Sequence, residues 1–294
     1  MTTVHLVDAS PYIFRAHFSL PSSIKTPDGS PAAASYGFTS FLLKLIADEK
    51  PTHLAVTFDR SLNSSFRNEI YPAYKEQRVL PPPELEAQLD ACEEIAAALG
   101  AATFIDDRYE ADDLIGALCA RLEPAGHGAV IVTSDKDLAQ LVTERITLLD
   151  FSKGLRLDAA AVFEKFGVRP DQITDYLGLA GDTVDNIPGV KGIGGKSAAE
   201  LLGQFGHLEE LYERLAELPW SKIRGAKSLH AKLVANREIA FLSKQLATVA
   251  REIPGVKAVL KDLEYKGADA GKVEALFQRL GFNKIRDRVP YQGA

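Results

Sequence analysis

Three apolar runs that each close with aspartate decide how this chain folds: VHLVD at residues 4–8, HLAVTFD at residues 53–59 and AVIVTSDKD at residues 129–137. A short apolar run that ends in a polar residue is typical of a buried strand in a parallel sheet. Ligands of such sheets bind beyond the carboxyl ends of the strands. We therefore expect the closing aspartates to meet at one edge of one sheet: Asp8, Asp59, Asp135 and Asp137.

Strand and helix patterns alternate from residue 4 to about residue 150. We expect strands at residues 4–7, 53–58, 103–105, 129–133 and 146–149, and helices at residues 34–47, 83–99, 111–122 and, as a single turn, 137–142. This alternation indicates an α/β fold with a mostly parallel central sheet flanked by helices. Beyond residue 155 we expect no further strand, but helices at residues 159–166, 170–179, 196–205, 207–215, 225–235 and 237–244. We therefore divide the chain into an α/β core of residues 1–180 and a helical part of residues 181–294.

The composition is that of a soluble globular protein, with 294 residues of which 46% are hydrophobic and 25% charged. No apolar stretch is long enough to span a membrane, and the first ten residues lack the pattern of a secretory signal. We therefore expect a cytoplasmic protein without a membrane partner. Cys92 and Cys119 each fall in an apolar helical pattern, which favours two core thiols over a disulfide. The net charge of −6 argues against a nucleic-acid partner, unless metal ions mask the acidic groups.

Two further acidic clusters extend the expected edge. Glu110, Asp112 and Asp113 open the helix expected at residues 111–122, and Asp182 and Asp185 follow the α/β core. Nine carboxylates in one place raise each other's pKa and do not stay ionised without a counter-ion. Hard oxygen ligands suit Mg²⁺ or Mn²⁺, and two such ions about 4 Å apart are able to hold a phosphodiester between a water and the leaving oxygen.

A single aspartate in such a position is more often a helix cap or a turn residue than a metal ligand. Carboxylates after three strands, together with two paired clusters, are harder to explain by capping. The sequence therefore predicts a divalent-metal site, and the lack of a histidine or cysteine cluster argues against zinc.

Residues 60–83 form a long insertion between an expected strand and an expected helix. The insertion carries Arg67, Lys75 and Arg78 and ends in three prolines. Insertions of this length in a compact domain are usually functional or mobile, and a solvated loop is the alternative. In the functional interpretation, Lys75 and Arg78 add positive charge beside a phosphate.

Four glycines lie in NIPGVKGIGGKSA, residues 186–198. The segment does not match the motif of a nucleotide-binding P-loop, because its second glycine is in the wrong position and no strand precedes it. We therefore reject an ATP site. Backbone N–H groups at a tight turn and a helix N-terminus suit a phosphate of a nucleic-acid backbone instead. Tyr36 is a core or rim aromatic, with base stacking as the alternative. Six cations form a basic face, whose alternative is a solvated pair of helices: Lys222, Arg224, Lys227, Lys232, Arg237 and Lys244.

Taken together, these blocks resemble one protein family. The chain is similar, from about residue 4 to about residue 249, to the 5′–3′ exonuclease and flap endonuclease family, and in particular to the 5′-nuclease domain of bacterial DNA polymerase I. The similarity rests on the order, spacing and content of DASPYIFRA, TFDRSLNSSFRNEIYPAYKEQR, YEADDLIGAL, TSDKDLAQLV, GLAGDTVDNIPGVKGIGGKSAAELL and FLSKQLATV.

The resemblance implies a PIN-like nuclease core, a helical arch over the active site at residues 60–83, and a helix–three-turn–helix element in the helical part. It implies that all nine acids bind metal and that Arg67, Lys75 and Arg78 contact the scissile phosphate. It also implies that the turn grips one strand of duplex DNA and binds a potassium ion at Val190, Ile193 and Ser197. The implied DNA contacts are Tyr36, Gly189, Lys191, Gly192, Gly194, Gly195, Lys196, Ser197, Lys222, Arg224 and Lys227.

The activity implied by the resemblance is that of a structure-specific DNA 5′ nuclease of replication and repair, dependent on Mg²⁺ or Mn²⁺. Its partners would be DNA with a 5′ flap, nick, gap or 5′ end, and RNA primer–DNA hybrids, bound by a monomer. Because the sequence stops at residue 294, without a polymerase domain, we expect a free-standing nuclease or a piece of a longer chain. Two other functions are weighed against this one: a non-catalytic module that binds branched DNA, which the complete acid set disfavours, and a PIN-type ribonuclease, which the duplex-gripping turn disfavours.

Overall fold

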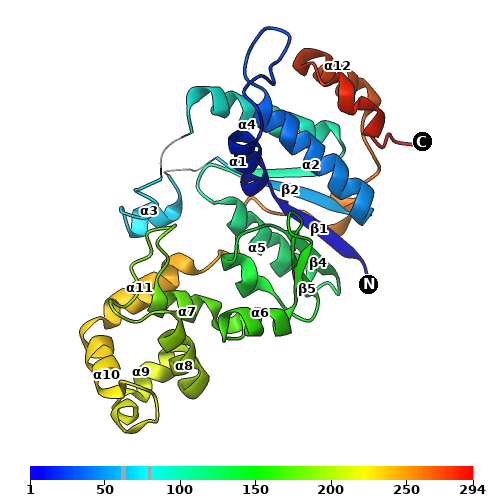
Figure 1. Ribbon diagram of the computed structural model, residues 1–294. Helices are drawn as coiled ribbons and strands as arrows, with labels where there is room; N and C mark the ends of the chain where they lie inside the picture. Colours follow the sequence, from blue (N-terminus) through cyan, green and yellow to red (C-terminus); the bar gives the residue numbers. More distant parts are fainter. Residues whose placement is uncertain (61–63, 79–80, 294) are drawn as a thin grey trace.

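A six-stranded sheet lies at the centre of the computed structural model, which describes residues 1–60, 64–78 and 81–293 (Figure 1). The strands are β1 (Thr3–Asp8), β2 (Leu54–Asp59), β3 (Ala102–Asp106), β4 (Gly128–Val132), β5 (Ile146–Asp150) and β6 (Leu155–Leu157). Their order is β3-β2-β1-β4-β5-β6. The first five strands run parallel, and β6 pairs antiparallel with β5. The predicted mostly parallel α/β sheet is therefore confirmed, with β1 and its closing Asp8 near the middle.

Helices cover both faces of the sheet, because successive side chains of each strand point to opposite faces. On β1, Leu6 belongs to one buried hydrophobic cluster and Val7 to the other. The cluster around Val7 is completed by α1 (Ser10–Ser19), α2 (Ala33–Glu49), α4 (Pro83–Ala98) and α12 (Ala270–Leu280). The cluster around Leu6 is completed by α5 (Ala111–Leu122), the 3₁₀ turn η1 (Asp137–Leu141), α6 (Ala159–Phe166) and α7 (Ile173–Ala180).

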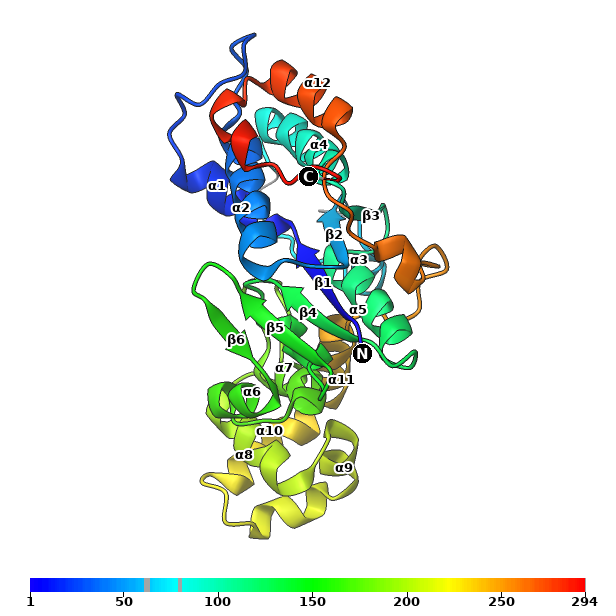
Figure 2. The same cartoon turned by 90° about the vertical axis from the view of Figure 1, so that its right-hand side faces the viewer.

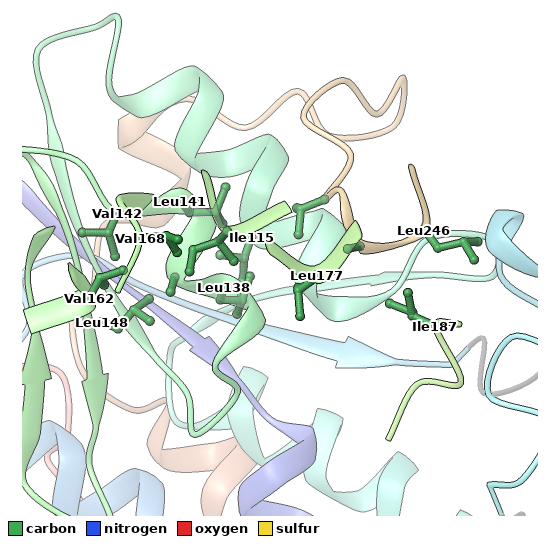
Figure 3. Packing of buried hydrophobic residues seen from close by; sticks show 14 of the residues in the cluster. Ile115, Leu138, Leu141, Val142, Leu148, Val162, Val168, Leu177, Ile187 and Leu246 are labelled. Atoms are coloured by element: carbon green, nitrogen blue, oxygen red, sulfur yellow. The ribbon is translucent and has the colours of Figure 1, made fainter. Parts of the chain in front are cut away.

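The remaining helices form a lobe that continues the cluster around Leu6 away from α12 (Figure 2). They are α8 (Gly195–Phe205), α9 (Leu208–Glu213), α10 (Ala226–Ala235) and α11 (Arg237–Ala247), with the short 3₁₀ turns η2 (Pro170–Gln172) and η3 (Leu215–Trp220). Two further 3₁₀ turns lie outside this lobe: η4 (Leu260–Leu263), and η5 (Asn283–Arg288), which packs against α12 in the cluster around Val7. Figure 3 shows how the core passes from Ile115 of α5 through Leu138 and Leu177 to Ile187 and Leu246. The helical part is therefore packed onto the sheet through a shared core.

Most predicted elements are confirmed, and α5 matches its predicted bounds. The sequence missed α1, α3 (Phe66–Ile70), α12 and β6, and β6 makes the expectation of no strand beyond residue 155 wrong. Proline at position 11 is tolerated in the first turn of α1, but it conceals the helix in the sequence. Strand β6 has only three residues, two of them exposed, so it lacks an apolar run.

Three other predictions concern the two cysteines, the arch and membrane-spanning helices. Cys92 and Cys119 are buried free thiols, as expected. Residues 61–63 and 79–80 of the predicted arch, and residue 294, lie outside the described residues. Within residues 1–60, 64–78 and 81–293, no helix has both the length and the apolar character needed to cross a membrane.

Candidate functional site

The closing aspartates of β1 and β2 stand side by side at the carboxyl edge of the sheet. Asp8 is buried and accepts a hydrogen bond of 2.8 Å from the Thr133 hydroxyl, just beyond β4. Asp59 accepts bonds from the Ser10 hydroxyl, at 2.6 Å, and from the backbone N–H of Ala111, at 2.7 Å. These bonds tie β1, β2, β4 and the first turn of α5 together at their acidic ends.

A cavity of about 510 Å³ opens above this edge. Five of the nine predicted acids line it, together with Lys75 and Arg78 of the insertion. Apolar side chains also line the cavity, among them Phe14 and Phe18 of α1 and Leu85 of α4. The Phe18 side chain is exposed. The five acids are Asp8, Asp59, Glu110, Asp112 and Asp135.

Burial and crowding oppose the ionisation of several of these carboxyl groups. Burial, and then the charge of Asp59, raises the pKa of Asp8 to about 8. Burial is also the main cause that raises the pKa of Asp112 and of Asp135. Burial and the neighbouring Asp135 raise the pKa of Asp137 to about 8. The site therefore contains more negative charge than its own groups neutralise.

Other acids of the edge are paired with cations. Lys75 Nζ lies 2.7 Å from Glu110 Oε2, and Arg78 Nη2 lies 2.5 Å from Asp185 Oδ1. Burial alone would raise the pKa of Glu110, but Lys75 and Arg67 outweigh it and the pKa falls. Likewise Asp182, which is 2.6 Å from Lys136 Nζ, has a lowered pKa despite its burial.

Residues 73–78 of the insertion lie against the acidic loop that follows α7. The backbone N–H of Lys75 donates to Asp185 O at 3.1 Å, and Asn186 Nδ2 donates to Ala73 O at 2.6 Å. Gln77 Nε2 donates to Thr183 O at 2.9 Å. These contacts hold Lys75 and Arg78 over the carboxylates, as the prediction for the insertion requires.

Arg67 and Asp113 do not occupy their predicted positions in the cavity. Arg67 is 3% exposed and Asp113 is fully buried. The guanidinium donates two bonds to the Asp113 carboxylate, at 2.7 and 2.8 Å, and two more to the backbone carbonyls of Leu246 and Thr248. Asp113 also accepts from Ala250 N at 2.8 Å. The Asp113 carboxylate accepts four bonds from protein groups, and Arg67 donates four of its five N–H groups to protein acceptors, so Arg67 does not fit a phosphate contact and Asp113 does not fit a metal ligand.

Asp137 lies at the border between the acidic edge and the helical lobe. Strand β4 ends at Val132, so Asp135 and Asp137 do not share one side of a strand; Asp137 instead opens η1. It lines a second cavity, of about 230 Å³, with Lys136 and Gly195. In the described part of the chain, its buried Oδ1 has no hydrogen-bond partner.

The predicted DNA-gripping turn, residues 186–198, is held by α10 and α11. Gly189 N donates to Ser243 Oγ at 2.9 Å, and Lys232 Nζ donates to Gly192 O at 2.8 Å. Helix α8 begins at Gly195 without a side-chain cap, so its first N–H groups face outwards for an anion. The predicted contacts Lys191, Gly192, Gly194 and Lys196 are exposed, Gly195 and Ser197 are half-buried, and Gly189, Val190 and Ile193 form the buried base of the turn.

The basic face is smaller than the sequence suggested. Lys222, Arg224 and Lys227 are exposed, and no ion pair holds them within the described ranges. Lys232 is used to support the turn, and Lys244 pairs with Asp175 at 2.6 Å. Arg237 stacks its guanidinium over two aromatic rings of the lobe.

Tyr36 lies away from the acids. Its ring packs edge-on against Phe282 with a centroid distance of 5.3 Å, and it lines a separate cavity between α1 and α2. This position supports the rim interpretation and not the stacking of a base beside the acidic cavity.

Several residues of the site were not singled out from the sequence. Lys136 stands between Asp135 and Asp137, and this charge alternation was a usable signal. Ser10 and Thr133 each follow an apolar run, but a hydroxyl there is common in turns. Phe14 and Phe18 were missed because α1 itself was missed.

Two family models match the chain. One is described as 5′-3′ exonuclease, N-terminal resolvase-like domain, over residues 3–167, and the other as 5′-3′ exonuclease, C-terminal SAM fold, over residues 168–271. The chain belongs to the 5′-3′ exonuclease family. The resemblance inferred from the sequence blocks is thereby confirmed.

Relatives among characterised proteins are bacterial DNA polymerases. DNA polymerase I of Bacillus caldotenax is 40% identical over 288 residues, which make up 97% of this chain and 32% of the polymerase. DNA polymerase I of Pseudomonas aeruginosa is 45% identical over 249 residues, 84% of this chain and 27% of the polymerase. The chain thus spans about a third of the length of these relatives.

Solved structures with the same fold include T5 5′-exonuclease and the catalytic core of Rad2. T5 5′-exonuclease with bound zinc matches with a TM-score of 0.69 and 23% identity, over 83% of this chain and 89% of that one. The catalytic core of Rad2 in complex with DNA substrate matches with a TM-score of 0.64 and 18% identity, over 98% and 91%. At these identities the likeness establishes the fold, namely a nuclease-type core with a helical C-terminal part.

The acidic edge fits a divalent ion chemically, although its carboxylates are not gathered around one point. In the described ranges, no three acidic, histidine or cysteine side chains already stand in the arrangement of a metal site. Hydrogen bonds to Ser10, Thr133 and Lys75 hold the oxygens apart. The unpartnered oxygen of Asp137 and the raised pKa of Asp8 are both relieved by a bound cation.

Proposed function

We propose that this chain is a metal-dependent nuclease that hydrolyses DNA at 5′ ends and 5′ flaps. The observation that carries the proposal is the cavity at the carboxyl edge of the sheet, where five acids from the ends of β1 and β2, the loop after β4 and the start of α5 meet two cations of the insertion. A carboxylate cavity repels a phosphodiester on its own, so the acids imply a cation that carries the substrate's charge.

The metal ligands in this proposal are the eight acids other than Asp113. They would hold Mg²⁺ or Mn²⁺, most simply as two ions, which would orient a water and offset the charge that develops on the phosphate. Lys75 and Arg78 would leave their carboxylate partners and donate to the same phosphate. The proposed ligands are Asp8, Asp59, Glu110, Asp112, Asp135, Asp137, Asp182 and Asp185.

Duplex DNA would be held on the helical lobe. The supporting features are the start of α8 at Gly195, which has no side-chain cap among the described residues, the exposed Lys191 and Lys196, and the exposed cations Lys222, Arg224 and Lys227. These groups contact phosphates and not base edges, so we expect binding to depend on salt and on duplex shape rather than on sequence. A potassium ion at Val190, Ile193 and Ser197 belongs to the same proposal, supported by the tight turn that these residues make.

The substrates we propose are DNAs with a 5′ flap, nick, gap or 5′ end, and RNA primer–DNA hybrids, processed by a monomer during replication and repair in the cytoplasm. The support is family membership and the presence of both the acidic cavity and the helical lobe with its exposed cations. A non-catalytic DNA-binding module is the weaker alternative, because clustered buried acids weaken the binding of a polyanion. A ribonuclease specific for single strands would have no use for the turn at α8.

One assay separates these functions. A labelled 5′-flap DNA, a blunt DNA duplex and an RNA single strand are each incubated with and without Mg²⁺. We expect Mg²⁺-dependent cleavage of the flap DNA, loss of that cleavage in Asp8→Asn, and retained flap binding in a gel shift. Asp106→Asn is the matched control, because Asp106 closes β3 beside Asp59 but only caps a turn through Arg108 and Tyr109. Cleavage that survives in EDTA, or in Asp8→Asn, contradicts the proposal.

A further inference from the structure

Residues 246–250, which are the last two residues of α11 and the three that follow it, run directly behind the acidic edge, and we call them the linking segment. Gln140 of η1 binds this segment twice: its Nε2 donates to Ala247 O at 2.9 Å, and its Oε1 accepts from Val249 N at 2.9 Å. The same Nε2 donates to Asp137 O at 3.0 Å. One buried amide therefore joins the linking segment to the backbone of a proposed metal ligand.

A second set of bonds joins the linking segment to the start of α5. Arg67 donates to Leu246 O at 2.8 Å and to Thr248 O at 3.0 Å, while Asp113 accepts from Ala250 N at 2.8 Å. Asp113 is the neighbour of Asp112 in the acidic cavity. Gly116 allows the close approach, because a Cβ there would collide with the Val249 side chain and lie 2.8 Å from Ala250 O.

Helix α11 also reaches the proposed DNA-gripping turn. Ser243 Oγ, about one turn before the linking segment, accepts from Gly189 N at 2.9 Å. Gly178 allows helices α7 and α11 to approach closely, because a Cβ at this position of α7 would lie 3.0 Å from Ala240 O of α11. Leu246 is itself buried in the core that Figure 3 shows beside Ile187. A continuous set of buried bonds therefore runs from the turn to the acids.

We propose that the linking segment fixes the distance between the DNA-gripping turn and the acidic cavity, and thereby selects which phosphodiester is cut. Gln140, Arg67 and Asp113 are positioning residues in this view, and none of them touches the DNA. The inference rests on the proposed nuclease function. Its physical basis is that a displacement of about 1 Å between substrate and reacting groups is enough to cost roughly 10²-fold in rate.

The test compares two buried glutamines that make equivalent bonds. Gln140 binds two carbonyls and one N–H of the backbone, and so does Gln172, which joins η2 to the end of α8 through Leu202 O, Gly206 O and Arg169 N. Gln140→Met and Gln172→Met each remove three backbone bonds while keeping the side-chain volume. Gly116→Ala displaces the linking segment by a second route that leaves Gln140 intact.

Cleavage products of a 5′-labelled flap DNA with Mg²⁺ are resolved to single nucleotides, and duplex affinity is measured in parallel. For Gln140→Met and Gly116→Ala we expect cuts at neighbouring phosphodiesters and a turnover lower by about 10-fold to 10²-fold, with unchanged affinity. Gln172→Met should keep the product positions of the unmodified protein.

Two results overturn the inference in distinguishable ways. If the unmodified protein cuts and both Gln140→Met and Gly116→Ala keep its product positions, the linking segment does not set the cut site and the nuclease function stands. If the unmodified protein does not cut any flap DNA, the proposed function fails and this inference fails with it. If the three variants merely contain less folded protein, the amount of product falls but the cleavage positions stay the same. That result also counts against the role of the linking segment in setting the cut site.

Discussion

The buried pair of Arg67 and Asp113 gives a sharp prediction about stability. Arg67→Met keeps most of the side-chain volume but removes the guanidinium, which makes four hydrogen bonds and is 3% exposed. Breaking a buried ion pair by removing one partner costs about 3–5 kcal/mol, because the other charge stays buried alone. Asp113 keeps only its bonds from Ala250 N and Glu110 N. We therefore expect Arg67→Met to lower the free energy of unfolding by about 4 kcal/mol.

The assay is urea unfolding followed by circular dichroism, with the free energy extrapolated linearly to water. The double variant Arg67→Met/Asp113→Asn removes both charges, and its loss should be smaller than the sum of the single losses by about 0.5–3 kcal/mol. The amide oxygen that Asp113→Asn introduces is still able to accept the bond from Ala250 N, which limits the second loss. Arg108→Met is the control, because Arg108 pairs with Glu69 on the surface, where both side chains are more than half exposed.

A loss below about 1 kcal/mol for Arg67→Met, the range of an exposed ion pair, would refute the assignment of Arg67 to the core. The predicted phosphate contact would then be restored as the better account of this residue. If the stability loss of the double variant equals the sum of the two single losses, the direct pairing is refuted, because the losses of residues that share no interaction are additive.

Single groups give three further predictions. Burial lowers the pKa of His5 below 6.5, although Glu49 opposes the shift. The unfolded chain therefore binds the proton more readily than the folded chain, so the free energy of unfolding falls as the pH drops below 6.5. His5→Gln should lessen that fall when urea unfolding at about pH 5 is compared with urea unfolding at about pH 7. Trp220 is the single tryptophan and is 85% exposed beside Lys222 and Arg224, so duplex DNA should quench its fluorescence and added salt should reverse the change; emission unaltered by saturating duplex places the interface elsewhere. Lys75→Ala and Arg78→Ala should slow single-turnover cleavage at saturating enzyme more than they weaken flap binding, with Arg108→Ala as the control; equal rates contradict their role at the phosphate.

Local sequence signals were sufficient for the five parallel strands of the sheet and for the acids at its carboxyl edge. Each apolar run specifies a buried strand, and the polar residue that closes it must emerge at the edge, as Asp8 and Asp59 do. Helix α5 matched its prediction because its first turn carries its own signal. The Asp113 carboxylate accepts from the backbone N–H of Glu110 at 3.1 Å, which is one half of a capping box. These features depend on neighbours within a few residues, which a sequence displays directly.

The roles of Arg67, Asp113 and Lys244 depend on partners that are distant in the chain. Arg67 and its acceptor Leu246 are separated by 179 residues, and nothing near Arg67 distinguishes a buried guanidinium from one that meets DNA. Asp113 follows Asp112 immediately, yet on a helix adjacent residues point in different directions, so one faces the cavity and the other the core. A cluster of acids therefore predicts a metal site more reliably than it predicts which acids belong to it.

The insertion shows how the fold places a positive charge among the carboxylates of this site. Lys75 and Asn186 both have left-handed backbone, with φ of 55° and 54°, a conformation that costs non-glycine residues about 1–3 kcal/mol. The two residues lie in segments that bind each other through Lys75 N with Asp185 O and Asn186 Nδ2 with Ala73 O. Those bonds offset the backbone cost, and the turn at Lys75 directs its Nζ to Glu110. The sheet brings the carboxylates to one edge, but the strained turn of the insertion is what places a cation among them.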